Sequence, residues 1–235
     1  MNTGDIIKEV DILLVESGVP IYKKETVVVE DTVHLCLNGR RHAVLTAIPK
    51  NIEELVLGHL LSSGSIRKLT DVKQLTTDSE LQTVQVETAG GKVMPMAVAD
   101  GLCMPLDDIL TNMDQFLRKS SLFTDTGAVH SCALIVDGQL LHFMEDIGRH
   151  NAFDKTIGAA LLKKTPLDRA AVLTSGRVPK DMMLKIIQSQ LQIVASRSAP
   201  TDSAIRLALR NNVTLCGFTR RERINIYSGR QRIIS

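Results

Sequence analysis

Residues 171–217, AVLTSGRVPKDMMLKIIQSQLQIVASRSAPTDSAIRLALRNNVTLCG, alternate short apolar runs with longer amphipathic ones. The runs at 171–174, 193–195 and 214–217 predict strands, and the segments near 180–191 and 202–210 predict helices. Strands that alternate with helices of this length form βαβ units. This part of the chain therefore predicts a largely parallel sheet in an α/β fold.

Two polar loops follow the first two of these strands. In an open α/β sheet, ligands bind beyond the carboxyl ends of the strands. Free N–H groups at helix starts attract anions, and arginine offers donors that match a phosphate group. We therefore expect a site for a phosphorylated ligand, built from Ser175, Gly176, Arg177, Ser196, Arg197, Ser198 and Thr201. The alternative is that the hydroxyl groups cap helices and the arginines lie in solvent.

The segment EDIGRHNAFDKTIG, residues 145–158, carries more polar groups than a helix start requires. It follows a strand pair expected at 131–136 and 139–144, and it opens a helix expected from about 151 to 163. Asn151 is an acceptable N-cap, and acids suit the positive end of a helix. Arg149 and His150 have no capping role, so we expect them to contact a ligand. The candidates for cofactor binding in this segment are Arg149, His150, Asn151, Asp154 and Lys155.

The N-terminal half is expected to be β-rich. Strands are predicted at 26–30, 33–37 and 41–46, with a hairpin turn at Asn38-Gly39. Asn51 and Glu54 have the spacing of a capping box at the start of a helix. A second hairpin is expected over 82–98, with its turn at Gly90-Gly91.

The middle of the chain changes character. A helix is expected from Pro105 to about Leu117, because proline suits the first turn of a helix. Residues 124–128 are expected to form a linker. We therefore predict two domains, a smaller β-rich one at 1–120 and an α/β one at 121–235.

The composition limits the classes of function. Apolar residues make up 44% and charged residues 23%, which is typical of a globular protein. Aromatic residues make up 3%, so base stacking on single-stranded nucleic acid is poorly supported. The net charge of +2 is too small to indicate a polyanionic partner. Arginines gather near the C-terminus, where a solvated basic tail is favoured over an anion-binding surface.

The cysteines indicate a reducing environment. Cys36, Cys103, Cys132 and Cys216 are scattered and do not form a disulfide framework. The first residues, MNTGDIIKEVD, do not resemble a signal peptide, and no apolar segment reaches the length of a membrane span. We expect a cytoplasmic protein that has no membrane partner.

Several separated motifs resemble one family. The segment at 145–158, TSGR at 174–177, SRSAPT at 196–201, RINIY at 223–227 and IPKNIEELVLGHLLSSGSI at 48–66 occur in its order. On these motifs the chain resembles the formate dehydrogenase accessory sulfurtransferase family, FdhD/NarQ. The resemblance implies a cytidine-deaminase-like C-terminal domain, a smaller β-rich N-terminal domain and a homodimer.

The resemblance also implies a function. Members take persulfide sulfur from a cysteine desulfurase and pass it to the bis-molybdopterin guanine dinucleotide cofactor of formate dehydrogenase, which they bind. This cofactor contains a guanine nucleotide with phosphates, which would suit the expected site. On this basis the chain is expected to be a sulfurtransferase, with a guanine nucleotide as an analogue of its ligand.

One motif departs from the family pattern. Members carry a Cys-x-x-Cys pair between the domains, whereas residues 99–108 read ADGLCMPLDD, with Cys103 alone. A single thiolate is able to take sulfur and hold it for a second attack, so Cys103 is the expected sulfur carrier. His130 matches a family histidine and is the second catalytic candidate, while Cys132 stands where alanine is usual.

Other interpretations stay open. Without the cysteine pair, the chain is alternatively a molybdenum-cofactor-binding chaperone that transfers no sulfur. His34 with Cys36 and His130 with Cys132 suggest a zinc site, but buried cysteines beside hydrogen-bonded histidines are favoured, and no metal is expected. The zinc deaminase signature is absent, so a deaminase-like fold would not imply deamination. A nucleic-acid binder that uses the C-terminal arginines is the least favoured reading.

Overall fold

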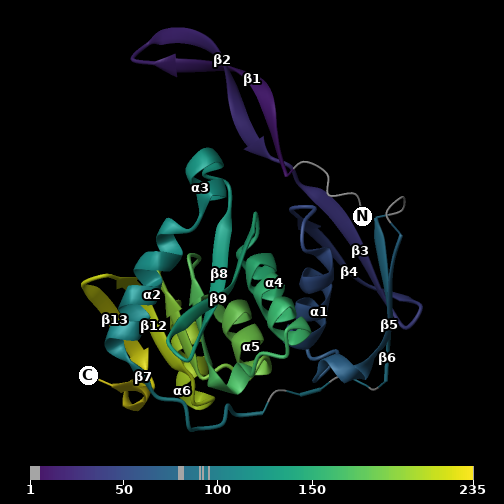
Figure 1. Ribbon diagram of the computed structural model, residues 1–235, viewed down its shortest axis with the longest axis vertical. Helices are drawn as coiled ribbons and strands as arrows, with labels where there is room; N and C mark the ends of the chain where they lie inside the picture. The colour runs from purple at the N-terminus through teal and green to yellow at the C-terminus, as the bar shows by residue number, and fades with distance from the viewer. Residues whose placement is uncertain (1–5, 79–81, 90, 92, 95, 235) are drawn as a thin grey trace.

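A mixed α/β architecture is observed in the computed structural model, which describes residues 6–78, 82–89, 91, 93–94 and 96–234. Its largest sheet has the strand order β13-β12-β11-β10-β8-β9 (Figure 1). The strands are β8 (His130–Val136), β9 (Gln139–Asp146), β10 (Ala170–Thr174), β11 (Ile193–Ser196), β12 (Thr214–Arg220) and β13 (Arg223–Ser228). The neighbours β10-β11 and β11-β12 are parallel, which confirms the prediction for residues 171–217. The outer pairs of this sheet are antiparallel.

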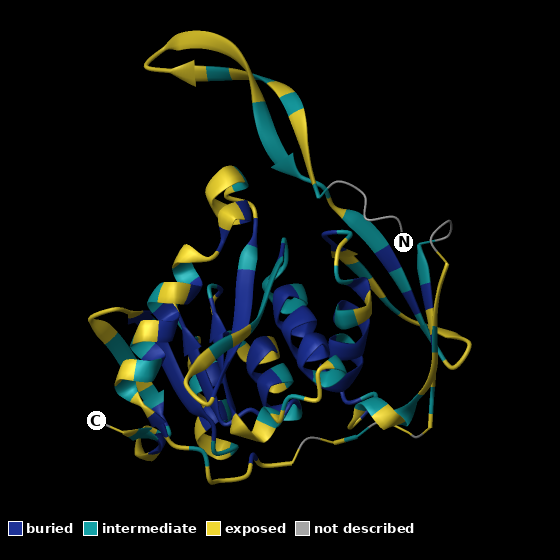
Figure 2. Cartoon of the chain, in the orientation of Figure 1, coloured by how far each residue is buried: buried dark blue, intermediate teal, exposed yellow. Residues whose placement is uncertain are grey.

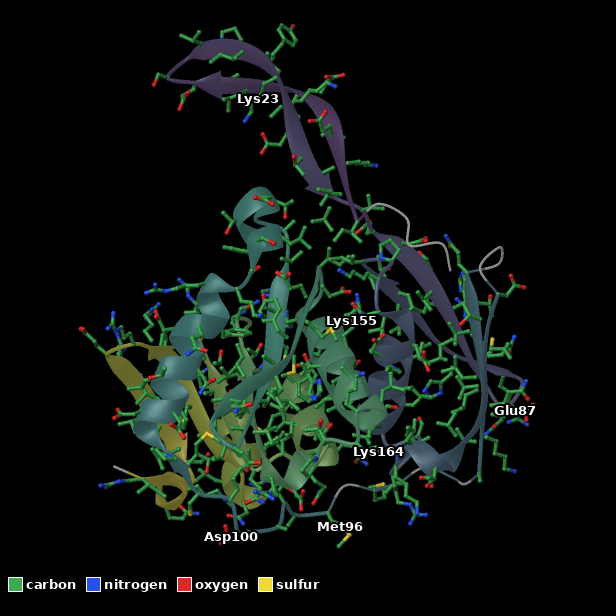
Figure 3. The ribbon with its side chains drawn as sticks, viewed as in Figure 1. Lys23, Glu87, Met96, Asp100, Lys155 and Lys164 are labelled. Carbon is green, nitrogen blue, oxygen red and sulfur yellow. The ribbon has the colours of Figure 1, made fainter. Side chains whose placement is uncertain are left out.

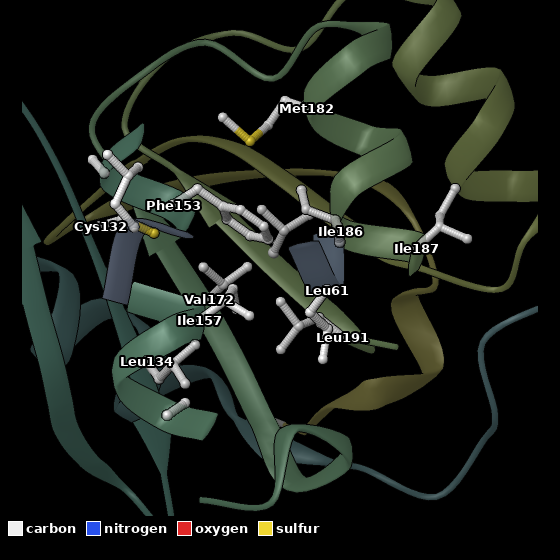
Figure 4. Close-up of a cluster of buried hydrophobic side chains, with 14 of the residues drawn as sticks. Leu61, Cys132, Leu134, Phe153, Ile157, Val172, Met182, Ile186, Ile187 and Leu191 are labelled. Atoms are coloured by element: carbon white, nitrogen blue, oxygen red, sulfur yellow. The ribbon is translucent and has the colours of Figure 1, made fainter. Parts of the chain in front are cut away.

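Helices cover both faces of this sheet. The helices are α4 (Arg149–Leu162), α5 (Lys180–Gln188), α6 (Asp202–Arg210) and, on the other face, α2 (Leu106–Arg118). Side chains along a strand alternate between the two faces. Val172 packs with α4 and α5, while its neighbour Leu173 packs with α2. Figure 4 shows the first of these cores, where Phe153 and Ile157 of α4 meet Val172 and Ile186.

A second, four-stranded sheet has the order β4-β3-β6-β5. Its strands are β3 (Asp31–Leu37), β4 (Arg40–Ala47), β5 (Val72–Asp78) and β6 (Thr83–Thr88). The turn at Asn38-Gly39 is confirmed, and both residues have the positive φ that such a hairpin turn requires. The helix α1 (Ile52–Ser62) follows β4.

The second expected hairpin is wrong. The strand β6 pairs with β5, which precedes it, and with β3 in parallel. Gly91 and the other described residues up to 98 form no strand, and Gly90 lies outside the described residues. The sequence of β5, VKQLTTD, has only two large apolar side chains. Its alternation was therefore too weak to be recognised as a strand.

A long hairpin at the N-terminus was not predicted. It consists of β1 (Ile7–Glu16) and β2 (Val19–Val28), and the expected strand at 26–30 is only the end of β2 and the residues after it. Figure 1 shows this hairpin projecting away from the rest of the chain, and Figure 2 shows it mostly exposed. We call it the N-terminal arm.

Two expected helix starts differ in detail. Asn51 stands at the N-cap of α1, but its side chain caps no backbone N–H and instead donates to Glu54 Oε1 at 3.0 Å. The helix α4 begins at Arg149 with Gly148 as its N-cap, so Asn151 lies inside the first turn. The expected linker at 124–128 is partly helical, because α3 (Ser121–Thr126) ends there.

The remaining elements are short. They are the 3-10 helices η1 (Leu69–Asp71), η2 (Leu167–Arg169) and η3 (Arg230–Arg232) and the strands β7 (Met104–Pro105) and β14 (Ile233–Ile234). The helix α2, which the sequence placed in the N-terminal domain, packs on the six-stranded sheet. The helix α1 packs on α4, so one continuous core joins the two sheets.

The contact between α1 and α4 depends on two glycines. A Cβ atom at Gly58 would lie 1.8 Å from the carbonyl oxygen of Asp154, and one at Gly158 would lie 1.8 Å from that of Glu54. Both obstacles are backbone atoms, which cannot rotate away. The two helices therefore touch directly through their backbones.

We expect Gly158→Ala to lower the free energy of unfolding by about 3 kcal/mol or more, because the helices would be forced apart. Urea unfolding followed by circular dichroism measures this. Gly91→Ala is the matched control, because a Cβ there meets nothing within 4 Å. Equal stability of the two variants would contradict the direct backbone contact.

Candidate functional site

A cavity of about 550 Å³ opens at the carboxyl ends of the parallel strands. One wall is polar and includes His130, Ser175, Arg197 and Ser198. The other wall is apolar and comes from α2, α3 and the segments beside them. The apolar residues of the lining are Phe116, Leu117, Phe123, Val129 and Ile147. We call this cavity the edge pocket.

Serines join the two loops that form its polar wall. Ser198 Oγ donates to the carbonyl of Ser175 at 2.9 Å, and the buried Ser196 Oγ donates to that of Gly176 at 2.8 Å. Ser175 Oγ in turn accepts from the backbone N–H of Ser131 at 2.9 Å. The serines therefore hold the loops together rather than cap helices. Among the hydroxyl groups of these two loops, Thr201 caps a helix, because its side chain accepts from Ala204 N at the start of α6.

Arg149 approaches this wall from the first turn of α4. A Cβ atom at Gly176 would lie 2.9 Å from Arg149 Cβ, so a glycine is needed for this approach. The Nε atom of Arg149 is buried and has no hydrogen-bond partner among the described residues. Such a donor is available to an anion that enters beside it.

His130 lines the pocket and lies near Arg149 and Arg177. Burial lowers its pKa, and the positive charges of Arg149 and Arg177 lower it further. The imidazole is therefore neutral at neutral pH and either donates or accepts a hydrogen bond. Its Nδ1 lies 3.4 Å from Ser175 Oγ.

The expected arginines thus meet at one edge of the sheet, although in different positions. Arg197 lines the pocket, while Arg149 and Arg177 lie close enough to affect His130 without lining the pocket. His150 does not line it either, and its Nε2 lies 3.0 Å from the carboxylate of Asp181 at the start of α5.

Asn151, Asp154 and Lys155 are placed elsewhere. Lys155 is buried and lies 2.7 Å from Asp146 Oδ2, and it donates to the carbonyl of Ile48 at 3.1 Å. Asn151 donates to the carbonyl of Thr46 at 2.7 Å. Figure 3 labels Lys155, in the middle of α4, on the side of this helix that adjoins α1. These contacts hold the segment between β4 and α1 against α4. A ligand contact through Lys155 would break the ion pair of Lys155 with Asp146.

Asp154 belongs to a second buried group. It accepts from Ser62 Oγ at 2.7 Å and pairs with His59 and Lys185. Burial acts to raise the pKa of Asp154, but the charge of Lys185 and the contact with His59 outweigh burial and hold this pKa below its usual value. The polar residues of segment 145–158 therefore have two different roles. Arg149 lies against Gly176 beside the polar wall of the edge pocket, whereas the helix face with Asn151, Asp154 and Lys155 fastens the N-terminal half to the sheet.

Cys103 lies at the opposite edge of the sheet. It is exposed in a separate cavity of about 520 Å³, whose lining includes Asp168 and Arg169, next to the start of β10. The edge pocket opens where β10 ends, and five residues of strand span about 16 Å. The structure therefore does not bring Cys103 together with His130 or the arginines.

The other cysteines differ from Cys103. Cys132 and Cys216 are buried, and burial raises the pKa of each thiol to about 12. Such thiols are inert at neutral pH. His34 and Cys36 lie on β3, in a different sheet from His130 and Cys132. Within the described ranges, no three His, Cys, Asp or Glu side chains are grouped to hold a metal ion.

The sequence did not identify the apolar wall. Phe116 lies on α2 and Phe123 on α3, and neither residue belongs to a recognisable motif. Their place became visible only once α2 packed on the sheet. Ser131 was missed as well, although it follows the candidate His130 directly.

Fold and site together define an α/β protein with an arginine-bearing, half-apolar pocket at one sheet edge and an exposed thiol at the other. The model of the FdhD/NarQ family matches residues 28–97 and 91–234. The chain belongs to this family.

Known relatives agree with this assignment. The chain is 32% identical to the sulfur carrier protein FdhD of Bacillus subtilis, covering 95% of this chain and 96% of the relative. It is 30% identical to that of Wolinella succinogenes, covering 99% and 91%. A crystal structure from Desulfotalea psychrophila, described provisionally as a formate dehydrogenase accessory protein, superposes with a TM-score of 0.87 at 30% identity, over 98% of this chain and all of that one. Among the described residues, no helix has the length and apolarity needed to cross a membrane.

Proposed function

We propose that the protein is a sulfur carrier in the maturation of formate dehydrogenase, with Cys103 as the carrying thiol. The supporting observation is that one fold presents an exposed cysteine and an anion-suited pocket at separate edges. The names of the relatives support sulfur carriage. The four cysteines are free, which fits a reducing, cytoplasmic setting.

In this proposal, the edge pocket binds the guanine nucleotide part of a bis-molybdopterin guanine dinucleotide cofactor. The phenyl rings of Phe116 and Phe123 offer an apolar wall to a ring system, and Arg197 offers charged donors to a phosphate. A cavity of about 550 Å³ suits one nucleotide. The rest of so large a ligand would lie outside, toward Arg149 and Arg177.

The sulfur step begins at Cys103. Its thiolate attacks the terminal sulfur of a persulfide carried by a cysteine desulfurase. A new S–S bond forms on Cys103, the S–S bond of the donor breaks, and the donor cysteine leaves as a thiolate. One sulfur atom moves and no external oxidant is needed. The terminal sulfur on Cys103 is then available for the cofactor.

The separation of the two edges favours a second candidate function. Strand β10, about 16 Å long, lies between the cavity of Cys103 and the edge pocket, so a nucleotide held by Arg197 would lie away from the thiol. A molybdenum-cofactor-binding chaperone would need only the pocket. The presence of a single cysteine in residues 99–108 also favours the chaperone function.

The cytidine-deaminase-like description of the C-terminal domain stays part of the proposal. It concerns the fold alone, because the sequence lacks the zinc ligands of that chemistry.

The first expected result concerns the pocket. Isothermal titration with GDP should detect binding, and Arg197→Ala should weaken it about tenfold, as for a lost charge-assisted hydrogen bond. Arg210→Ala is the matched control, because this exposed arginine lies at the far end of α6. Failure of the unchanged protein to bind GDP would exclude both candidate functions.

The second expected result concerns sulfur. After incubation with a cysteine desulfurase and cysteine, intact mass should show one added sulfur on the protein and none on Cys103→Ala. Cys36→Ala, which changes a half-buried thiol, should still gain it. A protein that binds GDP but never gains sulfur would establish the chaperone function instead.

A homodimer is also proposed, with the N-terminal arm as its contact surface. A two-stranded ribbon is only marginally stable in water by itself. Near its tip the arm exposes large apolar side chains, namely Leu13, Val15, Val19, Ile21 and Tyr22. Four of its charges are paired, as Lys23–Glu25 and Lys24–Glu9, and its net charge is small, so repulsion between two copies would be weak. A two-fold contact buries the same surface on both copies.

Sedimentation should therefore show a dimer, and the double change Leu13→Ser with Tyr22→Ser should shift it to the monomer, because the apolar contact is lost. Val44→Ser, an exposed apolar residue on β4, is the control and should leave the dimer intact. A dimer that persists in the double variant would place the interface elsewhere.

A further inference from the structure

We propose that Arg232 is a positioning residue for Cys103. Its buried guanidinium holds the segment 100–104 in one place, so that the thiol meets an incoming sulfur donor in a fixed orientation. The inference rests on the proposed function, because it assumes that Cys103 accepts persulfide sulfur. It concerns a residue 129 positions away from the cysteine in sequence, one of the C-terminal arginines for which a solvated tail was favoured. That expectation is wrong for Arg232, which is buried.

The first observation is the burial of Arg232. Only 1% of this residue is exposed, and it is among the largest fully buried side chains of the described chain. A buried guanidinium is costly unless it is paired and hydrogen-bonded. The groups that pair with this guanidinium therefore stabilise η3. They also show which part of the chain Arg232 holds in place.

One of these partners lies in the cysteine segment. The Nη2 atom of Arg232 lies 2.8 Å from Asp100 Oδ1, an ion pair that is not aligned as a hydrogen bond. The carboxylate side chain is 70% exposed and lines the same cavity as Cys103. The guanidinium therefore anchors, from inside the protein, an acidic residue that would otherwise lie free on the surface.

A second partner connects Arg232 to the residue before Cys103. The Nε atom donates to Gln192 Oε1 at 3.3 Å, and the backbone N–H of Leu102 donates to the same oxygen at 2.9 Å. Gln192 is buried, and its Nε2 donates to the carbonyl of Asp168 at 2.9 Å. The side-chain amide of Gln192 is thus held in one orientation. Through this amide, Arg232 fixes the position of the backbone N–H of Leu102.

The other side of Cys103 is held by the residues that follow Arg232. Ile233 and Ile234 of β14 pair in parallel with Met104 and Pro105 of β7. Met104 is buried in the core against α2, with Ile233 packed beside it. Cys103 is therefore exposed, but the backbone on both sides of it is fixed through the C-terminal segment. Residues 100–103 belong to no helix or strand, and β7 begins directly after Cys103.

This bracing matters for the transfer step. Attack on a persulfide requires the thiolate to approach the terminal sulfur along the S–S bond, and small errors in position cost large factors in rate. A thiol on a loose segment would have to be ordered at each encounter. Arg232 orders it in advance and does not itself touch the reacting atoms.

The experiment compares Arg232→Gln with Arg230→Gln, a change of an exposed arginine in the same 3-10 turn for which the structure gives no contact with the cysteine segment. Persulfide gain from a cysteine desulfurase is followed by intact mass over time. We expect the rate for Arg232→Gln to fall about tenfold or more and that for Arg230→Gln to match the unchanged protein. Arg232→Lys should recover part of the rate, because the charge opposite Asp100 returns.

Two further measurements distinguish positioning from general damage. Alkylation of Cys103 by iodoacetamide should not slow in Arg232→Gln, because a small reagent needs no fixed orientation. GDP affinity at the opposite edge should also be unchanged, which shows an intact fold. If Arg232→Gln does not fold, Asp100→Ala removes one anchor from the surface and should lower the transfer rate in the same direction.

The outcomes separate the two proposals. If the unchanged protein gains no sulfur, the sulfur-carrier function fails and the role of Arg232 fails with it. If the unchanged protein gains sulfur and a folded Arg232→Gln or Asp100→Ala gains it equally fast, only the positioning role is overturned. Equal slowing of transfer and of alkylation would also overturn it, because access to the thiol would then be the cause.

Discussion

The direct backbone contact between α1 and α4 is the constraint on which the rest of the structure depends. Gly58 and Gly158 leave no room for a side chain, and the ion pair between Lys155 and Asp146 is buried beside the same joint. Because this joint fixes α4, it also fixes the first turn of α4 against Gly176. The polar wall of the edge pocket is thus positioned by packing between the two halves of the chain.

The two edges of the six-stranded sheet have different electrostatic character. At the carboxyl edge, arginines surround a histidine whose pKa is lowered, mainly by burial. The positive charge there stays with the arginines while the imidazole remains neutral, which suits an anionic ligand. At the other edge Cys103 lies among Asp100, Asp108, Asp137 and Asp168, with Arg169 paired to Asp137. The edge pocket is therefore the more favourable of the two regions for a negatively charged group.

Residues near the two ends of the described chain pack beside the edge pocket and beside Cys103, respectively. Beside the pocket, Ile6 and Val28 at the base of the N-terminal arm pack with Leu122 and Val129, and Val129 also lines the pocket. At the thiol edge, the last strand pairs with the residues that follow Cys103. Contacts made at either end of the sequence are therefore transmitted to one of the two regions through packed side chains rather than through flexible links.

Cys103 was singled out through the resemblance to the family. The α/β class, the parallel strands of residues 171–217 and the serine- and arginine-bearing loops at their ends could be predicted from the sequence directly. Each of these follows from local periodicity or composition. The packed structure was needed to show that Asp154 and Lys155 stabilise the region where α1 meets α4 and that α2 and α3 supply an apolar wall. It was also needed to show that Cys103 lies at the edge of the sheet opposite the pocket. These outcomes depend on contacts between distant positions, such as Ile48 with Asp146, 98 residues apart. Local patterns show which side chains are polar or apolar, whereas only the packed chain shows which partner each one meets.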